Sequence, residues 1–394
     1  MEHPRIIDIR DTCTGCGACA DSCKKGCITM AQDEHGFYYP QIDLKRCVMC
    51  GVCGSSCHVL AASNQYDTPQ WWGRSSVYVY QSRSKDILEN STSGGAFTLF
   101  ASKVLDAGGV VFASRYNGDL ERLEFSDTDN HELCVFRKSR YMESYTNGVF
   151  GRIKDYLMEG RSVLFCGTPC QVAGLNEFLG KIDRRNLLTL NFICHGVPSN
   201  RHFHEWLHSK FPSIQQIDNV DFRYKNKNEG WGWHQMCLSI KEKSGRRTSI
   251  PYTDSSYYLS FFHNDLLRKS CYSCRIINKQ VADITLGDFW GVNNKQSIDD
   301  DNSGLSLVIL HSEKAQSLLP VLETEGSLCH LDYQDIEYAF HPRVYSLENR
   351  VKMEEGIKRF GYVDYLDRKY KITILKYKME KIIPIQKIYK WLNK

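Results

Sequence analysis

Two runs of cysteines near the N-terminus have the spacing of iron–sulfur ligands. The pattern Cys-x2-Cys-x2-Cys-x3-Cys occurs once from Cys13 to Cys23 and again from Cys47 to Cys57, and each run contains a glycine-bearing turn, "CTGCGAC" or "CVMCGVC". In bacterial two-cluster ferredoxins, three thiolates of a run bind one [4Fe-4S] cluster and the fourth cysteine binds the other. The spacing therefore predicts two [4Fe-4S] clusters, one held by Cys13, Cys16, Cys19 and Cys57 and the other by Cys47, Cys50, Cys53 and Cys23.

Both runs depart from the usual ferredoxin pattern after the fourth cysteine. Lys24 and His58 stand where a proline is common, and Cys27 is an additional thiol close to Cys23. Neither departure removes a ligand. Zinc is the alternative for clustered cysteines, but zinc modules usually present pairs of ligands rather than runs of four. We therefore expect iron–sulfur clusters.

Four further cysteines lie far from these runs. Cys170 in "CGTPCQ" and Cys194 in "ICHG" each fall in a loop after a predicted strand, and Cys271 and Cys274 form a CxxC pair in "KSCYSC". A CxxC pair can be redox-active or can bind zinc. The four thiols together can instead hold one more cluster. The residues alone leave these alternatives open.

Composition and charge restrict the class of protein. The chain has 394 residues, 17 cysteines and a net charge of +4. The small net charge argues against a nucleic-acid partner, and clustered cysteines in a reducing compartment indicate metal rather than disulfides. The chain opens with "MEHPR", which is no signal region, and has no apolar run of the ~20 residues that a membrane span needs. We expect a cytoplasmic protein.

The segments after the cysteine runs alternate between strand and helix patterns. This alternation predicts an α/β body with a mainly parallel sheet, preceded by a small α+β ferredoxin-like module. Strands are expected at "VVFASRY", "SVLFC" and "LLTLNFIC", with helices over 171–179 and 200–210 and a hairpin within "CLSIKEKSGRRTSIPY". Ser312 is expected to cap a helix. The turn "STSGG" precedes a helix whose free N–H groups suit a phosphate, although a plain capping loop explains it equally well.

Six motifs in the body resemble a known family. In their order and separation they are similar to the beta subunit of coenzyme F-420 hydrogenase/dehydrogenase, an iron–sulfur flavoprotein family that includes 7-hydroxymethyl chlorophyll a reductase, over most of residues 75–345. The motifs are "STSGGAF", "KSRYMESY", "GTPCQVAGL", "ICHGVPS", "KSCYSC" and "ADITLGDFWG".

The resemblance implies FAD and a third [4Fe-4S] cluster in the body. The cluster ligands that it implies are Cys170, Cys194, Cys271 and Cys274. The flavin-binding residues that it implies are Ser93, Gly94, Gly95, Lys138, Ser139, Arg140 and Tyr141. Cys166 lies within a strand and has no matching role, so we expect a buried thiol there. The same interpretation applies to Cys27, Cys134, Cys237 and Cys329.

These assignments divide the chain into five segments. We expect a ferredoxin-like module over 1–65, a linker over 66–76, a flavin-binding part of the body over 77–160, a part with the core cluster over 161–345, and a basic amphipathic helical tail over 346–394. Pro384 should break the tail into two helices. A basic amphipathic helix can lie on an anionic membrane, here the inner face, but docking on the body or on a partner explains the tail equally well.

The expected function is electron transfer between clusters and flavin. Clusters exchange single electrons, and flavin connects them to hydride chemistry. The electrons would pass to or from a small organic substrate or the deazaflavin coenzyme F-420, with a redox protein such as ferredoxin as partner. The sequence identifies no catalytic residue. Two alternatives are an electron-transfer subunit that feeds a separate hydrogenase, formate dehydrogenase or biosynthetic reductase, and a non-catalytic zinc scaffold. In "EGWGWHQ", two tryptophans can cover a planar ring or pack together.

Overall fold

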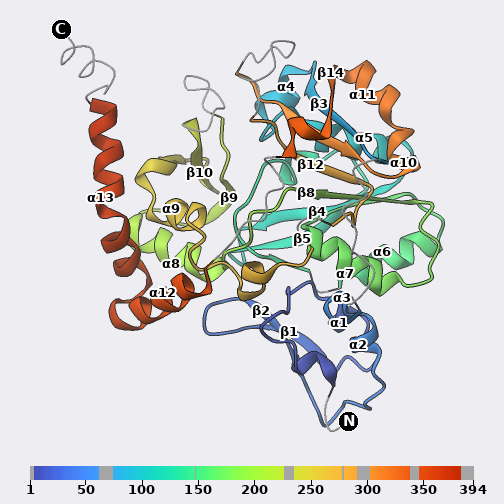
Figure 1. Ribbon diagram of the computed structural model, residues 1–394, viewed down its shortest axis with the longest axis horizontal. Coiled ribbons are helices and arrows are strands. Elements are labelled where there is room, and N and C mark those ends of the chain that lie inside the picture. The colour runs from blue at the N-terminus through green and yellow to red at the C-terminus, as the bar shows by residue number, and fades with distance from the viewer. Residues whose placement is uncertain are drawn as a thin grey trace.

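A computed structural model describes most of the chain (Figure 1). It describes residues 4–61, 74–146, 148–225, 235–276, 279–290, 302–337 and 346–382. Most of the predicted linker, nearly all of "EGWGWHQ" and Pro384 lie outside the described residues.

The N-terminal module is built around two antiparallel strands and three short helices. Strand β1 (Ile28–Gln32) pairs with β2 (Tyr38–Ile42). The helices are α1 (Ala18–Asp21), α2 (Val52–Ser55) and α3 (His58–Ala61), with a 3-10 turn, η1 (Arg5–Ile7), at the start. Gly17 and Gly51 precede α1 and α2 with φ of 80° and 75°, a left-handed conformation that glycine adopts at little cost. Each cysteine run therefore turns at a glycine and enters a helix.

The body contains one sheet of nine strands among the described residues. Their order across the sheet is β14 (Gly326–Leu331), β3 (Ser76–Ser82), β13 (Ser306–Leu310), β12 (Ile284–Asp288), β8 (Leu187–Phe192), β7 (Val163–Cys166), β4 (Val110–Asn117), β5 (Arg122–Thr128) and β6 (Ser144–Tyr145). The four central strands, β12, β8, β7 and β4, are parallel. Antiparallel strands extend the sheet on both sides. The predicted α/β body with a parallel sheet is confirmed, and its parallel part is the centre.

Helices cover both faces of this sheet. Alternate residues of a strand face opposite sides, so Phe112 of β4 packs with the helices of one face and Val111 with those of the other. The first face carries α6 (Val149–Met158) and α7 (Pro169–Leu179). The second carries α5 (Ala96–Asp106), α10 (Glu313–Gln316) and α11 (Leu319–Glu325), with α4 (Lys85–Glu89) close to β3. Ser312 caps α10 as predicted, because its side chain accepts a hydrogen bond from the Ala315 N–H.

A second, smaller lobe packs beside the sheet. It has three antiparallel strands, β9 (Ile217–Asp221), β10 (Cys237–Glu242) and β11 (Arg247–Pro251), and the last two form the predicted hairpin. Its helices are α8 (Asn200–Lys210), α9 (Ser256–Phe262), α12 (Leu347–Phe360) and α13 (Tyr362–Ile382). Buried aromatic residues, among them Trp206 and Tyr257, fill its core. The remaining short 3-10 turns are η3 (Leu133–Val135), η5 (Tyr252–Asp254), η6 (Lys269–Ser273) and η8 (Tyr333–Asp335).

The tail is helical and packs against this lobe. Leu366 and Tyr370 of α13 are buried in its core, and Figure 1 shows α13 standing along the edge of the molecule. No helix in the described part of the chain combines the length and the apolar character that crossing a membrane requires.

Candidate iron–sulfur and flavin sites

The structure gathers the predicted cluster ligands into three groups. Burial raises the pKa of the Cys19 thiol, and the neighbouring Cys16, Cys13 and Cys57 raise it further. The pKa of Cys53 is raised by burial and by Cys47, Cys50 and Cys23. These neighbours are the two predicted sets of ferredoxin ligands. We call them the inner group (Cys13, Cys16, Cys19 and Cys57) and the outer group (Cys47, Cys50, Cys53 and Cys23).

The third group lies in the body. Burial raises the pKa of Cys271, with further contributions from Cys194, Cys170 and Cys274. We call these four thiols the core group. Three stretches of chain, around α7, the loop after β8 and η6, bring them together. The resemblance implied this set, and its members are indeed neighbours in space.

The three groups follow one another in space. Cys53 of the outer group is a neighbour of Cys19 of the inner group, and Cys170 of the core group is a neighbour of Cys16. Cys50 of the outer group is exposed, whereas Cys16 is buried. A path of thiols therefore leads from the surface of the N-terminal module into the body.

The chemistry of these donor sets fits iron–sulfur clusters. Burial and the proximity of other thiols disfavour thiolates, and a bound cationic metal centre removes that penalty because it deprotonates the thiols that coordinate it. Within the described residues, no three His, Cys, Asp or Glu side chains converge closely enough to hold a single metal ion. A [4Fe-4S] cluster is bound by four thiolates, each on its own iron, so its ligands need not meet at one point.

One prediction about Cys170 is wrong. This residue was expected in a loop, but it lies in the first turn of α7. The Thr168 side chain accepts a hydrogen bond from the Gln171 N–H, and the Gln171 side chain accepts one from the Thr168 N–H, which together form a capping box. Thr-x-x-Gln is the sequence pattern of a capping box, so the sequence itself indicates that a helix starts at this point.

Two thiols close to predicted ligands, those of Cys166 and Cys27, have different surroundings. Cys166 ends β7 as predicted, and burial raises the pKa of its thiol to about 12, but its side chain also lines the cavity described below. Cys27 is buried, as expected, but its sulfur lies 3.3 Å from that of Cys23. Cys27 is therefore in direct contact with a predicted ligand of the outer group.

A cavity of about 630 Å³ opens where the central parallel strands end. Cys170 and Cys194 of the core group line it, together with Thr14 and Gly15 of the N-terminal module. This volume is within the range of cofactor sites, and the carboxyl ends of parallel strands are where such sites form. Among the predicted flavin residues, those that line the cavity are Ser93, Gly95, Lys138, Ser139, Arg140 and Tyr141.

Gly94, by contrast, is required for packing. A β-carbon on Gly94 would lie 2.1 Å from the Tyr80 carbonyl oxygen, so only glycine fits between β3 and the loop. Its N–H donates a hydrogen bond to Ser306 Oγ at 2.9 Å. The two predicted flavin motifs are also joined directly, because the Ser139 N–H donates to Thr92 Oγ1 at 2.8 Å. Gly94 therefore positions the loop that lines the cavity.

The polar lining of the cavity fits an anionic cofactor such as FAD. Arg137 Nε, Arg140 Nε and Arg223 Nη2 are buried nitrogens without a hydrogen-bond partner among the described residues, and all three residues line the cavity. A buried unpaired N–H group is costly, and guanidinium groups bind phosphate oxygens well. Lys138 adopts φ of 72°, a strained conformation for a lysine and one of the kind that often marks functional sites. The residues present therefore fit a flavin dinucleotide.

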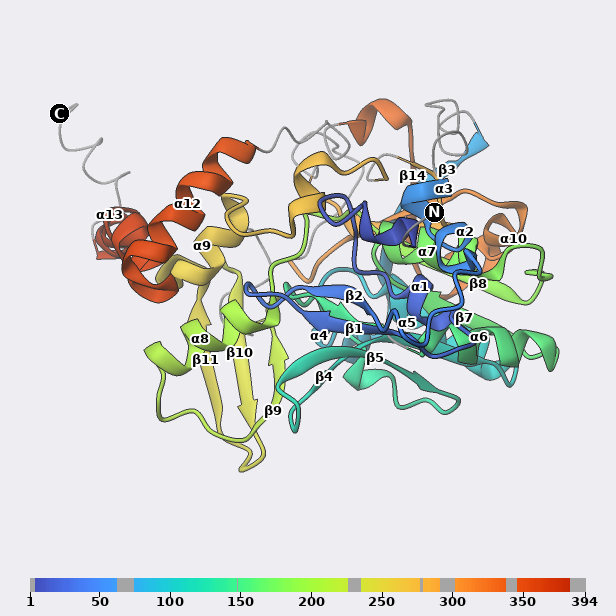
Figure 2. The same cartoon turned by 90° about the horizontal axis from the view of Figure 1, so that it is seen from below.

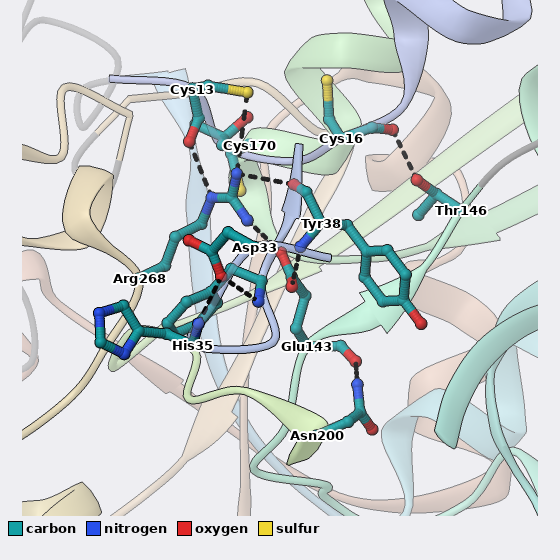
Figure 3. A network of polar contacts seen from close by, with 12 residues as sticks. Cys13, Cys16, Asp33, His35, Tyr38, Glu143, Thr146, Cys170, Asn200 and Arg268 are labelled. Atoms are coloured by element: carbon teal, nitrogen blue, oxygen red, sulfur yellow. Dashed lines mark hydrogen bonds and ion pairs between the residues drawn. The ribbon is translucent and has the colours of Figure 1, made fainter. Parts of the chain in front are cut away.

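A buried arginine joins the module to the body at this point (Figure 3). Arg268 Nε donates to the Cys13 carbonyl at 2.7 Å, and its Nη2 lies 3.7 Å from Cys13 Sγ and donates to the Tyr38 carbonyl at 2.9 Å. Its Nη1 pairs with Glu143. Burial raises the pKa of Glu143 to about 7, and the Arg268 charge opposes that rise. The Cys271 N–H donates to the Arg268 carbonyl at 2.8 Å, so Arg268 contacts one residue of the inner group and one of the core group.

The Arg268–Glu143 pair has no signature in the local sequence. Glu143 belongs to the motif "KSRYMESY", which was interpreted only for its flavin residues, and Arg268 lies just before "KSCYSC". No local pattern shows that two residues so far apart in sequence form an ion pair. Two further contacts seat the module: Thr146 Oγ1 donates to the Cys16 carbonyl at 2.8 Å, and Asp21 accepts from the Phe150 N–H at 2.8 Å at the start of α6.

Comparisons with known proteins define the class first as an iron–sulfur protein. Residues 12–61 match the model of a 4Fe-4S dicluster domain. An uncharacterized ferredoxin of Methanocaldococcus jannaschii is 42% identical over 52 residues, which are 13% of this chain and 66% of the ferredoxin. The ferredoxin-type protein NapF of Escherichia coli is 37% identical over 73 residues, which are 16% of this chain and 44% of NapF. The chain thus spans less than two thirds of these relatives.

The body is similar to a known family. Residues 160–335 match the model for the C terminus of the beta subunit in the family of coenzyme F420 hydrogenase/dehydrogenase. Over these residues the chain is similar to that family, and the predicted resemblance is confirmed; all four core-group cysteines lie within the match. A chain in the solved F420-reducing [NiFe] hydrogenase complex from Methanosarcina barkeri is also similar, with 14% identity and a TM-score of 0.46 over 75% of this chain and 96% of that one.

Proposed function

We propose that the chain is an iron–sulfur flavoprotein oxidoreductase with three [4Fe-4S] clusters and FAD. The observation that carries this proposal is the path of three thiol groups that ends at a cavity lined by the residues expected to bind flavin. The outer, inner and core groups would hold one cluster each. The nitrogens without partners, Arg137 Nε, Arg140 Nε and Arg223 Nη2, would bind the anionic part of the dinucleotide.

Bound flavin would supply the step between single-electron transfer and two-electron chemistry. The chain's own residues would bind and enclose it. Arg268 holds the inner and core groups close together, while Phe97, Phe192 and Tyr141 supply apolar surface to the cavity. The substrate would be a small organic molecule or the deazaflavin coenzyme F-420. The family match supports this proposal, because the family is named for that coenzyme.

Anaerobic purification and reconstitution test the proposal directly. We expect about twelve iron atoms per chain, as three [4Fe-4S] clusters require, and FAD that is released on denaturation. A colourless protein with zinc and no iron would establish the structural scaffold instead. Iron without flavin would overturn the flavoprotein assignment.

A second function, electron delivery to a separate catalytic subunit, is favoured by the family model, which describes a beta subunit. It predicts tight co-purification with a hydrogenase, a formate dehydrogenase or a biosynthetic reductase and no turnover by the chain alone. Anaerobic turnover of the purified chain with deazaflavin, nicotinamide and ferredoxin acceptors separates the two functions. The proposed segments, with boundaries at 65, 76, 160 and 345, are the same for both.

We also propose that the protein is cytoplasmic and that its tail touches the inner face of the membrane. One side of α13 exposes Ile372, Leu375 and Met379, whereas its other side packs on the body. Exposed Lys371 and Lys376 accompany these apolar side chains, as suits an anionic lipid surface. Co-sedimentation with vesicles of anionic lipid, but not of neutral lipid, is the expected result, and failure to sediment with either would contradict it.

A further inference from the structure

Equivalent positions in the two cysteine runs have different surroundings. In the first run, the residues between the cysteines are Thr14, Gly15, Gly17 and Ala18, and in the second they are Val48, Met49, Gly51 and Val52. Gly15 and Ala18 are buried against the body. Val48, Met49 and Val52 are 58%, 42% and 42% exposed. The first run therefore has small residues where it docks, and the second has larger apolar residues where it faces solvent.

The backbone of Met49 is strained in a way that a glycine would relieve. Gly15 adopts φ of 70° and Met49 adopts φ of 55°, so both residues are left-handed at the same place in the repeat. Gly15 has a second reason to be glycine, because a β-carbon there would lie 2.7 Å from Arg268 Nη1. Met49 keeps a side chain at a position where L-residues are disfavoured and then exposes it. This pattern indicates that the exposed Met49 side chain has a function.

Positive charge borders the same surface. Lys24 and Lys25 follow Cys23, and Lys45 and Arg46 precede Cys47; all four are exposed. Arg46 Nη2 donates to the Lys25 carbonyl at 2.9 Å, so the two basic segments are adjacent. Asp43 is the one acid in the segments 22–27 and 43–52. Leu44, which is 57% exposed, adds to the apolar area.

We propose that this outer surface is the docking site for an acidic one-electron carrier protein. The surface consists of Leu44, Val48, Met49 and Val52 with Lys24, Lys25, Lys45 and Arg46. The apolar centre would pack against the carrier beside the exposed Cys50, and the basic border would attract the carrier's acidic surface. The inference rests on the proposed function and deepens it by naming the class of partner. In each encounter the reduced carrier would lose one electron to the cluster that Cys47, Cys50, Cys53 and Cys23 would hold.

Stopped-flow reduction of the holoprotein by a reduced, acidic bacterial ferredoxin tests the site. We expect Lys24→Glu/Lys45→Glu to slow the second-order reduction at least tenfold at low salt, and the difference from wild type should shrink as salt screens the charges. The matched control is Lys103→Glu/Lys181→Glu, which reverses two exposed lysines on the body and should leave the rate unchanged. Equal rates for both pairs would overturn the docking site.

The substitution Met49→Gly should affect the stability of the protein and its rate of reduction by the ferredoxin in opposite directions. Glycine relieves the left-handed strain but removes apolar contact area, so we expect reduction by the ferredoxin to slow at least threefold without a lower melting temperature. Full bleaching by dithionite and unchanged iron content show that the clusters are intact. A protein that lacks iron or flavin would contradict the proposed function. A fully loaded protein whose rate of reduction is unchanged by these substitutions would contradict only the docking site. Binding of this surface to anionic vesicles instead of the ferredoxin would also contradict only the docking site.

Discussion

At the scale of single residues, the Arg268–Glu143 pair links the module to the body. Both side chains are buried, and the guanidinium also binds the carbonyls of Cys13 and Tyr38. The Tyr38 N–H donates to Glu143 Oε2 at 2.9 Å. A charge in such a place is tolerated only when its partner is present, because the remaining charge would be buried and uncompensated. The pair therefore makes docking of the module specific.

Removing one member of the pair should cost more than removing both. We expect Arg268→Met alone to lower the free energy of unfolding by about 3–5 kcal/mol, since the buried Glu143 carboxyl loses its charged partner and must either stay ionised without it or take up a proton. Adding Glu143→Gln should restore part of that loss. Anaerobic unfolding of the two single variants and the double variant measures the coupling. If the losses simply add, the two residues do not act as a pair.

At the scale of elements, α7 connects the core group to the inner group. Cys170 lies in its first turn, and Gly174, one turn later, faces the module. A β-carbon on Gly174 would lie 2.7 Å from Cys16 Sγ. Gly151 of α6 offers a comparison, because nothing lies within 4 Å of a β-carbon there. The close approach of α7 to the inner group therefore depends on one glycine.

The same substitution should have opposite effects at these two glycines. Gly151→Ala should stabilise the protein by up to about 1 kcal/mol, because alanine is the better helix former. Gly174→Ala should displace Cys16, lower the iron content and lower the melting temperature. Iron analysis and anaerobic thermal unfolding of both variants provide the measurement. Normal iron content in Gly174→Ala would show that the position of Cys16 does not depend on the close approach of α7.

A buried histidine connects three elements and should make stability depend on pH. His311, just after β13, lies 2.8 Å from Thr285 Oγ1 of β12 and 2.8 Å from Ser75 Oγ, next to β3. Burial lowers its pKa from the usual 6.5 to about 4. The folded state therefore resists protonation, and stability present above pH 6.5 is lost as the pH falls toward 4.

We expect His311 to account for a loss of about 2 kcal/mol between pH 7 and pH 5. His311→Gln cannot take up this proton, so its melting temperature should fall less than that of the wild type over the same range. Anaerobic melting curves at the two pH values measure the difference. Equal falls in the melting temperature of the two proteins would mean that the folded protein accommodates protonated His311.

The cysteine runs and the order of elements could be predicted from sequence because both are local patterns. Fixed spacing identifies the ferredoxin ligands, and alternating hydrophobic patterns identify strands and helices. Docking of the module depends instead on contacts such as that between Arg268 and Cys13, which are 255 residues apart. The four thiols of the core group come from three separate stretches of chain. No local pattern connects these stretches, so the group was predicted only from the family resemblance. The helical start at Cys170 was predictable, because Thr168 and Gln171 form a capping box.

At the scale of the whole molecule, the N-terminal module is positioned so that its two thiol groups have different surroundings. In Figure 1 it lies below the sheet, with α1 and α3 toward α7, and Figure 2 shows it from the side that faces away from the body. Cys16 and Cys57 of the inner group are buried, whereas Cys50 of the outer group is exposed. The thiol groups of the module therefore lead from the solvent-exposed Cys50 toward the cavity in the body.

The proposed order of groups predicts where a single substitution interrupts electron transfer. Cys170→Ser should remove about four of about twelve iron atoms and leave the two ferredoxin-type clusters reducible, while reduction of the flavin by ferredoxin slows at least a hundredfold. Cys166→Ser is the matched control, since Cys166 lines the same cavity at the end of β7 and is no predicted ligand. It should keep its iron and its rate of flavin reduction. If Cys166→Ser loses iron and Cys170→Ser does not, the ligand of the core cluster is the thiol at the end of β7 and not the thiol in the first turn of α7.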